Sequence, residues 1–245
     1  SPQTHYQAHT GAIYVHQGRT YLVQELDEAN HTVVVTRTQP EYYTQARDLT
    51  TVEVLDVAHE EYWGEIGVFY GDVKVTTQVV SFQRKALVSN ELLGEEPLEL
   101  EPRELFTKAV WFTIPEPRMH AAGVDAEMAP GSLHAAEHAA IGMLPLVASS
   151  DRVSTALHAD TGLPTIFVYD GHPGGAGFAE RAHAMAPHWL RATQEAILAC
   201  ECEKGCPSCV QSPKCGNRNN PLDKGGAVQL LGEILRLVPA GRSRR

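Results

Sequence analysis

Five cysteines near the C-terminal end limit what this chain can fold into more than any other feature. All of them lie between residues 200 and 215 of a 245-residue sequence. Four follow the spacing Cys202-x3-Cys206-x2-Cys209-x5-Cys215. Thiolates at such short intervals suit a tetrahedral metal ion with sulfur ligands about 2.3 Å away, and the Gly and Pro residues between them favour the tight turns that this requires. The spacing therefore predicts a structural site for Zn²⁺.

The fifth thiol, Cys200, leaves the choice of the first ligand open. It could replace Cys202, because a Cys-x-Cys pair can rarely direct both sulfurs at one ion. Two other interpretations are buried free thiols and a redox-active pair at Cys206 and Cys209. A disulfide scaffold is disfavoured, since secreted frameworks spread their cysteines along the chain, whereas a tight cluster in a reducing cytosol is typical of metal or catalytic sites.

Hydrophobicity gives no sign of a membrane protein. Hydrophobic residues make up 43% of the chain, but no run approaches the roughly 20 apolar residues that cross a bilayer, so no membrane partner is expected. The start of the chain shows no charged segment followed by an apolar stretch. It opens at Ser1-Pro2 without Met, which favours a fragment of something longer.

The charge distribution bears on nucleic-acid binding. A net charge of −10 disfavours it for the chain as a whole, because phosphate contacts need clustered Lys and Arg. Residues 201–245 reverse the balance, with eight basic and four acidic side chains. The candidate DNA contacts near the cysteines are Lys204, Lys214, Arg218 and Lys224. A basic end that only improves solubility explains the pattern equally well. Trp111 and Trp189 could stack on bases, although such aromatic residues are more often core.

The first half of the chain has the period-two pattern of β-strands. β-branched and aromatic residues alternate with polar ones from about Ala12 to Leu87. The first two strands are expected to form a hairpin around Gln17-Gly18. An acidic, Leu-rich linker from Asn90 to Glu104 leads to a further strand that ends at Pro115. We expect an antiparallel β barrel or sandwich here, as a β-rich accessory domain of residues 1–115.

The second half alternates helices with a strand. Ser132 is expected to cap a helix that runs to Pro145, and residues 163–170 form a short apolar run typical of a buried strand. A helical stretch with a break at Pro187 precedes the cysteines, and an amphipathic helix follows them. The pattern predicts a mixed α/β zinc-binding domain of residues 116–245, and the fold class of the whole chain is α+β.

A Gly-rich loop, GHPGGAG at residues 171–177, joins the strand to the next helix. Such a loop can bind phosphate at a helix N-terminus. This one lacks the Lys-Ser/Thr ending of a Walker A loop, and the acidic Asp170 and Glu180 flank it. A tight turn between strand and helix explains the glycines better.

The sequence His134-Ala-Ala-Glu137-His138 fits the H-x-x-E-H pattern of a metalloprotease class. On a helix the two histidines lie one turn apart, as two zinc ligands would. A third, carboxylate ligand is required, for which Asp170 and Glu180 are candidates. A packed helix face is the other interpretation of the same residues.

Three segments of the second half stand out in sequence and order: LHAAEHAAIGMLP, TGLPTIFVYDGHPGGAGFAERA and CECEKGCPSCVQSPKCGNRNNPLDKGGA. They resemble the C-terminal zinc-binding domain, once a domain of unknown function, of bacterial superfamily-two DNA helicases of the mitomycin repair factor A and Hrq kind. The resemblance covers roughly residues 118–235. Residues 1–115 resemble, more weakly, the β-domain between motor and zinc domain in those proteins.

The resemblance implies a cytoplasmic, ATP-dependent helicase that translocates on single-stranded DNA in repair. This chain would be its accessory region, which contacts DNA or braces the absent motor. Expected partners are therefore single-stranded DNA and the motor domains of the same parent chain. One Zn²⁺ per chain is expected, and the family's ligands carry over onto Cys202, Cys206, Cys209 and Cys215. The alternative is a metal-dependent hydrolase that uses His134, Glu137 and His138.

Overall fold

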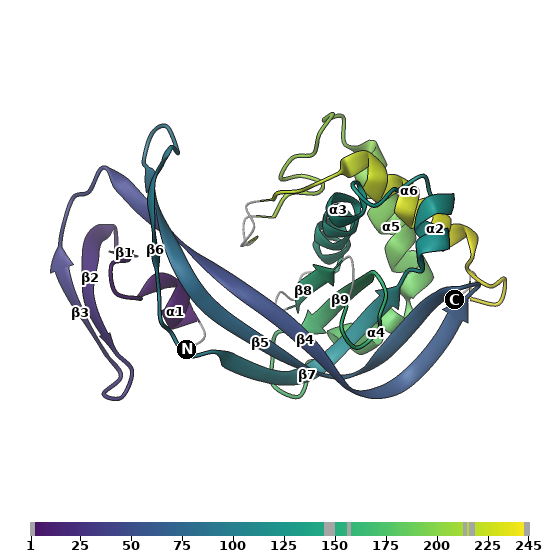
Figure 1. Cartoon of the computed structure of the whole chain (residues 1–245), viewed down its shortest axis with the longest axis horizontal. Helices are drawn as coiled ribbons and strands as arrows, with labels where there is room; N and C mark the ends of the chain where they lie inside the picture. The colour runs from purple at the N-terminus through teal and green to yellow at the C-terminus, as the bar shows by residue number, and fades with distance from the viewer. Residues whose placement is uncertain (1–2, 145–149, 156–157, 213–214, 216–218, 243–245) are drawn as a thin grey trace. The chain divides into compact units, whose positions relative to one another are not determined.

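A computed structural model describes residues 3–144, 150–155, 158–212, 215 and 219–242 of the chain (Figure 1). The chain divides into two compact units. Unit 1 comprises residues 1–50 and 76–104, and unit 2 comprises residues 51–75 and 105–245. The sequence predicts one boundary near residue 115. In the structure the chain changes unit three times, because the strands at residues 42–63, 66–86 and 103–113 each contribute to both units.

Unit 1 begins with the short helix α1 (Gln3–Gln7) and an antiparallel three-stranded sheet. Its strands are β1 (Ile13–His16), β2 (Arg19–Asp27) and β3 (Thr32–Arg37), in the order β1-β2-β3. β1 and β2 form the predicted hairpin. Gln17 and Gly18 have φ angles of 48° and 72°, as the tight hairpin turns with positive φ at both central residues require.

A six-stranded sheet contains the remaining strands. They are β4 (Tyr42–Trp63), β5 (Ile66–Ala86), β6 (Leu92–Pro97), β7 (Arg103–Thr113), β8 (Ser150–Thr155) and β9 (Thr165–Asp170). The order is β4-β5-β7-β9-β8, and β6 pairs with β5. The pairs β5–β6, β7–β9 and β8–β9 are antiparallel. The predicted α+β class with antiparallel sheets is confirmed, although β6 lies in the segment that was expected to be a linker.

The helices of unit 2 are α2 (Glu116–Ala121), α3 (Ala129–Gly142), α4 (Phe178–Ala184), α5 (Ala186–Ala199) and α6 (Lys224–Arg236). Ser132 does not cap α3 as predicted. The cap position is Met128, and Ser132 donates its hydroxyl to the Met128 carbonyl from inside the helix. Pro187 lies in the first turn of α5, where its missing N–H costs nothing, so it begins a helix instead of breaking one. Within the described ranges, no helix combines the length and apolarity needed to cross a membrane.

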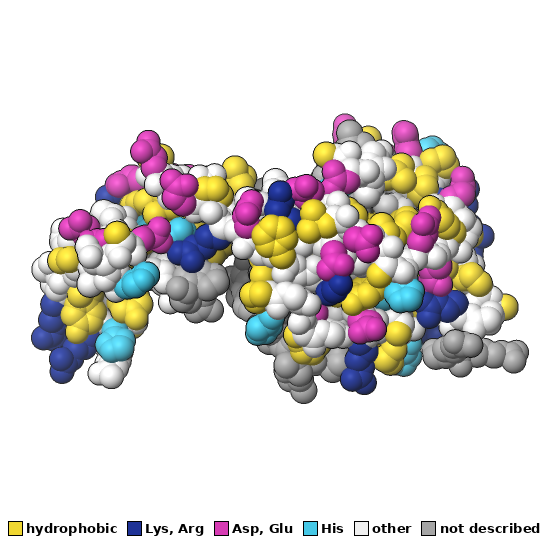
Figure 2. Space-filling model, turned by 90° about the horizontal axis from the view of Figure 1, so that it is seen from below, with side chains coloured by type: hydrophobic (Ala, Val, Ile, Leu, Met, Phe, Trp, Pro, Cys, Tyr) yellow, Lys and Arg dark blue, Asp and Glu magenta, His cyan; other side chains and the backbone are white. Residues whose placement is uncertain are grey.

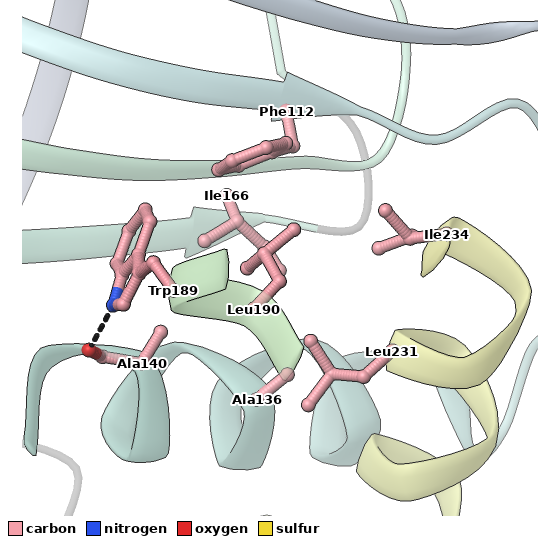
Figure 3. A pocket seen from close by; sticks show the side chains of 8 residues that line it. All are labelled: Phe112, Ala136, Ala140, Ile166, Trp189, Leu190, Leu231 and Ile234. Carbon is pink, nitrogen blue, oxygen red and sulfur yellow. Dashed lines mark hydrogen bonds between the residues drawn. The ribbon is translucent and has the colours of Figure 1, made fainter. Parts of the chain in front are cut away.

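The core of unit 2 lies between its sheet and the helices α3, α5 and α6, as Figure 3 shows. The side chains that converge there are Phe112, Ala136, Ala140, Ile166, Trp189, Leu190, Leu231 and Ile234. The indole N–H of Trp189 donates to the carbonyl of Ala140 at 2.7 Å, so its one polar atom is satisfied. Trp189 is 5% exposed and Trp111 is 2% exposed. Both rings therefore belong to the core and are not available to stack on bases.

α6 packs closely on α3 at Gly226. A Cβ at this position would lie 1.9 Å from Oγ of Ser132, so Gly226→Ala is expected to lower the free energy of unfolding by about 1–3 kcal/mol, as overpacking does. Gly225→Ala is the matched control, because its Cβ would meet nothing nearer than 3.6 Å. Urea unfolding followed by circular dichroism measures both variants. Equal midpoints for the two variants would contradict the close approach of the helices.

Candidate metal centre

The cysteine loop, residues 200–210, follows directly from the end of α5. Val210 anchors its far end, since the side chain is fully buried in the core. Gly205 has a φ of 105°, and a Cβ there would lie 2.4 Å from a methyl carbon of Val210, so only glycine suits the position. Cys209 N–H donates to the carbonyl of Cys206 at 3.0 Å. This turn brings the two sulfurs to 3.9 Å.

Four sulfur atoms converge in the cysteine loop, those of Cys200, Cys202, Cys206 and Cys209. All four lie within 4.8 Å of one another. The separations are 3.6 Å for 200–202, 3.5 Å for 200–206, 3.5 Å for 202–209 and 3.9 Å for 206–209. A tetrahedral ion with sulfurs at about 2.3 Å requires about 3.8 Å between sulfurs. The cysteines form no disulfide, and the cluster has the size of a four-thiolate metal site.

The set of converging sulfurs differs from the predicted set by one cysteine. Cys202, Cys206 and Cys209 lie together as expected, but the fourth sulfur belongs to Cys200. Cys215 lies in a different cluster, with its Sγ 3.3 Å from Nε2 of His134. The sequence left open which of Cys200 and Cys202 would lie in the cluster. Both sulfurs do, because Cys200 leaves α5 with an extended backbone, and residues two apart in an extended chain face the same side.

Hydrogen bonding lowers the pKa of one of these thiols, and burial raises the pKa of another. The backbone N–H of Ser208 lowers the pKa of Cys206 to about 7, so this sulfur forms a thiolate readily. Burial raises the pKa of Cys209 to about 12. A thiol of this kind gives up its proton when a bound cation compensates the charge. The four sulfurs are therefore better suited to bind a metal ion than to exist together as free thiolates.

Lys224 supports the cysteine loop from the start of α6. Its ammonium group donates to the carbonyls of Cys200 at 2.6 Å and Cys202 at 2.5 Å. It also donates to Sγ of Cys202 at 3.5 Å. Lys224 is therefore turned inward, in contrast to the outward DNA contact expected of it.

The other three candidate DNA contacts fall into two groups. Lys204 is exposed on the cysteine loop, which leaves its charge accessible to a phosphate. Lys214 and Arg218 lie outside the described residues.

The Gly-rich loop is built around Asp170. The Asp170 carboxylate accepts the backbone N–H of Ala176 at 2.7 Å and that of Ala179, in the first turn of α4, at 3.1 Å. Asp170 is fully buried. A carboxylate of the protein therefore already takes the place where a phosphate would bind, which supports the interpretation of the glycines as a tight turn.

The H-x-x-E-H histidines do not assemble the carboxylate-containing site that the hydrolase alternative requires. His134 and His138 lie on α3 with ring centroids 4.2 Å apart. Neither Asp170 nor Glu180 joins them, and in the described part of the chain the third member of their cluster is Cys215. This donor set differs from the two histidines and one carboxylate of such metalloproteases.

Together, the fold and the sulfur cluster define a structural metal-binding domain. Four thiols around one point close the coordination shell, so such a site leaves no position for a substrate.

Comparison with known proteins gives the family. The model of the family described as "MrfA Zn-binding domain" matches residues 136–210, a range that includes the four converging cysteines. The chain is 32% identical over 208 residues, 82% of its length, to "Uncharacterized ATP-dependent helicase YprA" of Bacillus subtilis, and covers 27% of that protein. It is 35% identical over 113 residues to "Uncharacterized protein MJ1572.1" of Methanocaldococcus jannaschii, matching 42% of this chain and 99% of that protein.

A solved structure agrees with this relationship. The crystal structure of DUF1998 helicase MrfA bound to DNA matches 94% of this chain and 31% of the MrfA chain, with a TM-score of 0.61 and 28% identity. The chain belongs to the MrfA Zn-binding domain family, and the proteins that it resembles include ATP-dependent helicases. It spans about a quarter of the length of YprA.

Proposed function

We propose that this chain is the zinc-binding accessory region of an ATP-dependent DNA helicase that acts in DNA repair in the cytoplasm. The observation that carries the proposal is the convergence of four thiols inside the segment that matches the family. A closed four-thiolate site stabilises a shape and performs no chemistry of its own. ATP hydrolysis and translocation would then belong to motor domains of the parent chain.

The proposed ligands of Zn²⁺ are Cys200, Cys202, Cys206 and Cys209. Their sulfur separations fit a tetrahedral zinc ion, and Lys224 holds the backbone of the loop through the carbonyls of Cys200 and Cys202. When bound, the ion would hold the loop that connects α5 to Val210. The role of zinc is therefore to fix the surface that the loop presents.

We further propose that this surface contacts single-stranded DNA. The exposed Lys204 lies on the cysteine loop, and Lys214 and Arg218 follow it in the sequence. On the face shown in Figure 2, acidic side chains are scattered over unit 2 among basic ones, without a broad basic patch. This face does not suit phosphates, so the proposed contact lies at the cysteine loop. The similar MrfA helicase was crystallised with bound DNA, which supports a DNA contact in general.

Fluorescence anisotropy with a labelled DNA single strand tests the DNA contact. With about three phosphate contacts, the affinity of the zinc-loaded chain should fall about 20-fold between about 50 and 200 mM salt. Lys204→Gln should weaken binding and reduce the salt dependence. Arg191→Gln, which removes an equal charge from the exposed side of α5, should leave both unchanged. Absence of binding at low salt would show the DNA contact to be wrong and would leave bracing of the motor as the role of the chain.

A further inference from the structure

We propose that the chain has a second metal site, formed by His134, His138 and Cys215, which binds Zn²⁺ independently of the four-thiol cluster. None of these three residues belongs to that cluster. The spacing of the cysteines predicts one zinc per chain. The second site raises the expected number to two.

The separations between the three donor atoms are already close to those between ligands of one metal ion. His134 and His138 are one helical turn apart on α3, and Sγ of Cys215 lies 3.3 Å from Nε2 of His134. One donor atom from each residue lies within 4.8 Å of the other two. Nitrogen and sulfur ligands of a tetrahedral zinc ion, at about 2.05 and 2.3 Å from it, are about 3.6 Å apart. An ion can therefore be accommodated with small side-chain adjustments.

Both imidazole rings are oriented as metal ligands usually are. Nδ1 of His134 lies 2.8 Å from the carbonyl oxygen of Pro221, and Nδ1 of His138 lies 2.7 Å from that of Val210. A carbonyl oxygen only accepts, so each Nδ1 carries the proton and each neutral ring has its lone pair on Nε2. A hydrogen bond from the second ring nitrogen to a carbonyl is the common outer support of a zinc-bound histidine. Two such bonds on adjacent histidines favour a metal site over simple packing.

The surroundings of Cys215 also suit a metal-bound thiolate. Cys215 and His138 are 8% and 5% exposed, so bulk water is largely excluded from the cluster. The backbone N–H of Asn219 points to Sγ of Cys215 at 3.3 Å, and such a donor stabilises negative charge on sulfur. Two imidazoles and one thiolate are donors that zinc accepts readily. The cluster has three members among the described residues, so a water molecule is expected at the fourth position.

The position of this cluster indicates what the second ion would do. The carbonyls that hold the two histidines belong to Val210 and Pro221. These two residues lie near the two ends of the segment between the cysteine loop and α6. Cys215 lies in the middle of that segment. An ion shared by α3 and Cys215 would fasten the segment to the helix. The first ion closes the cysteine loop, and the second would fix how the chain continues from it.

The zinc content of the full chain, purified under reducing conditions and measured by mass spectrometry, tests the second site. The unmodified chain should hold two zinc ions. His134→Asn and Cys215→Ser should each hold one, while His188→Asn, at an exposed position of α5, should hold two. Asparagine is chosen because its side-chain N–H takes the place of Nδ1–H and can keep the bond to Pro221. Two ions in both the His134 and the Cys215 variants would overturn the proposal.

Two further measurements separate the two sites and do not depend on the stability of any one variant. Cys206→Ser should lose the first ion and keep the second, and Co²⁺ in this variant should show the absorption of a site with one thiolate. X-ray absorption at the zinc edge of the unmodified chain should report five sulfurs and two imidazoles shared between two ions. A single zinc surrounded by four sulfurs alone would refute the second site and leave the first intact, with His134 and Cys215 in a plain hydrogen bond.

Discussion

Removal of metal from the full chain is expected to unfold the cysteine loop while the sheet of unit 1 keeps its structure. Apparent binding free energies of structural zinc sites are about 10–16 kcal/mol, comparable to the whole stability of a domain at about 5–15 kcal/mol. Hydrogen–deuterium exchange after chelation measures the effect. The amides of Cys209 and Gln211, which bond to the Cys206 carbonyl, should lose protection. The amide of Val23, bonded to Ala12 in unit 1, should keep it.

Restoration by metal is the control for this experiment. Zn²⁺ added to the chelated, reduced chain should return protection to the cysteine loop, whereas Mg²⁺, which prefers oxygen ligands, should not. Equal protection of the Cys209 amide with and without zinc would contradict a structural role for the metal.

Cys200→Ser is expected to release the metal from the four-thiol cluster, and Cys215→Ser is expected to leave it in place. Loss of an outer hydrogen-bond partner alone costs about 10–100-fold in metal affinity, so loss of a direct sulfur ligand should cost more than about 100-fold. Titration with Co²⁺ checks this through the sulfur-to-cobalt charge-transfer absorption. Cys215→Ser should keep the spectrum of a four-thiolate site, because Cys215 lies with His134 and His138.

The opposite result would be equally clear. If Cys215→Ser abolished the four-thiolate spectrum and Cys200→Ser preserved it, the ligand set that the spacing first suggests would be correct. The two variants remove the same sulfur atom from positions 15 residues apart in the sequence, so each serves as the control of the other.

The metal cluster could be predicted from the spacing of the cysteines, but the partition of the sulfurs could not. Three of the clustered sulfurs, those of Cys202, Cys206 and Cys209, were predicted. Short turns between closely spaced cysteines bring their sulfurs together without help from the rest of the fold. The exchange of Cys215 for Cys200 depends on the path of the chain after Val210, whose side chain is buried in the core. That path is set by tertiary contacts with α3. The histidines of the H-x-x-E-H pattern were visible in the sequence, but their partner Cys215 was not.

Strand pattern and helix pattern were predictable for the same reason, since each follows from the periodicity of apolar residues. The division into units was mostly hidden. Two of the three changes of unit fall within continuous strands near residues 50 and 75, where no linker composition marks them. The third, near residue 104, coincides with the end of the acidic segment that the sequence suggests as a linker. Pro187 shows the same limit, since a proline that ends one helix and one that begins the next look alike in sequence.

Anomalous X-ray scattering at the zinc edge, from crystals of the zinc-loaded chain, tests the central claim most directly. We predict an ion about 2.3 Å from each of four sulfur atoms, those of Cys200, Cys202, Cys206 and Cys209. Sulfurs joined in a disulfide with no ion between them, or an ion bound by Cys215 in place of Cys200, would contradict it.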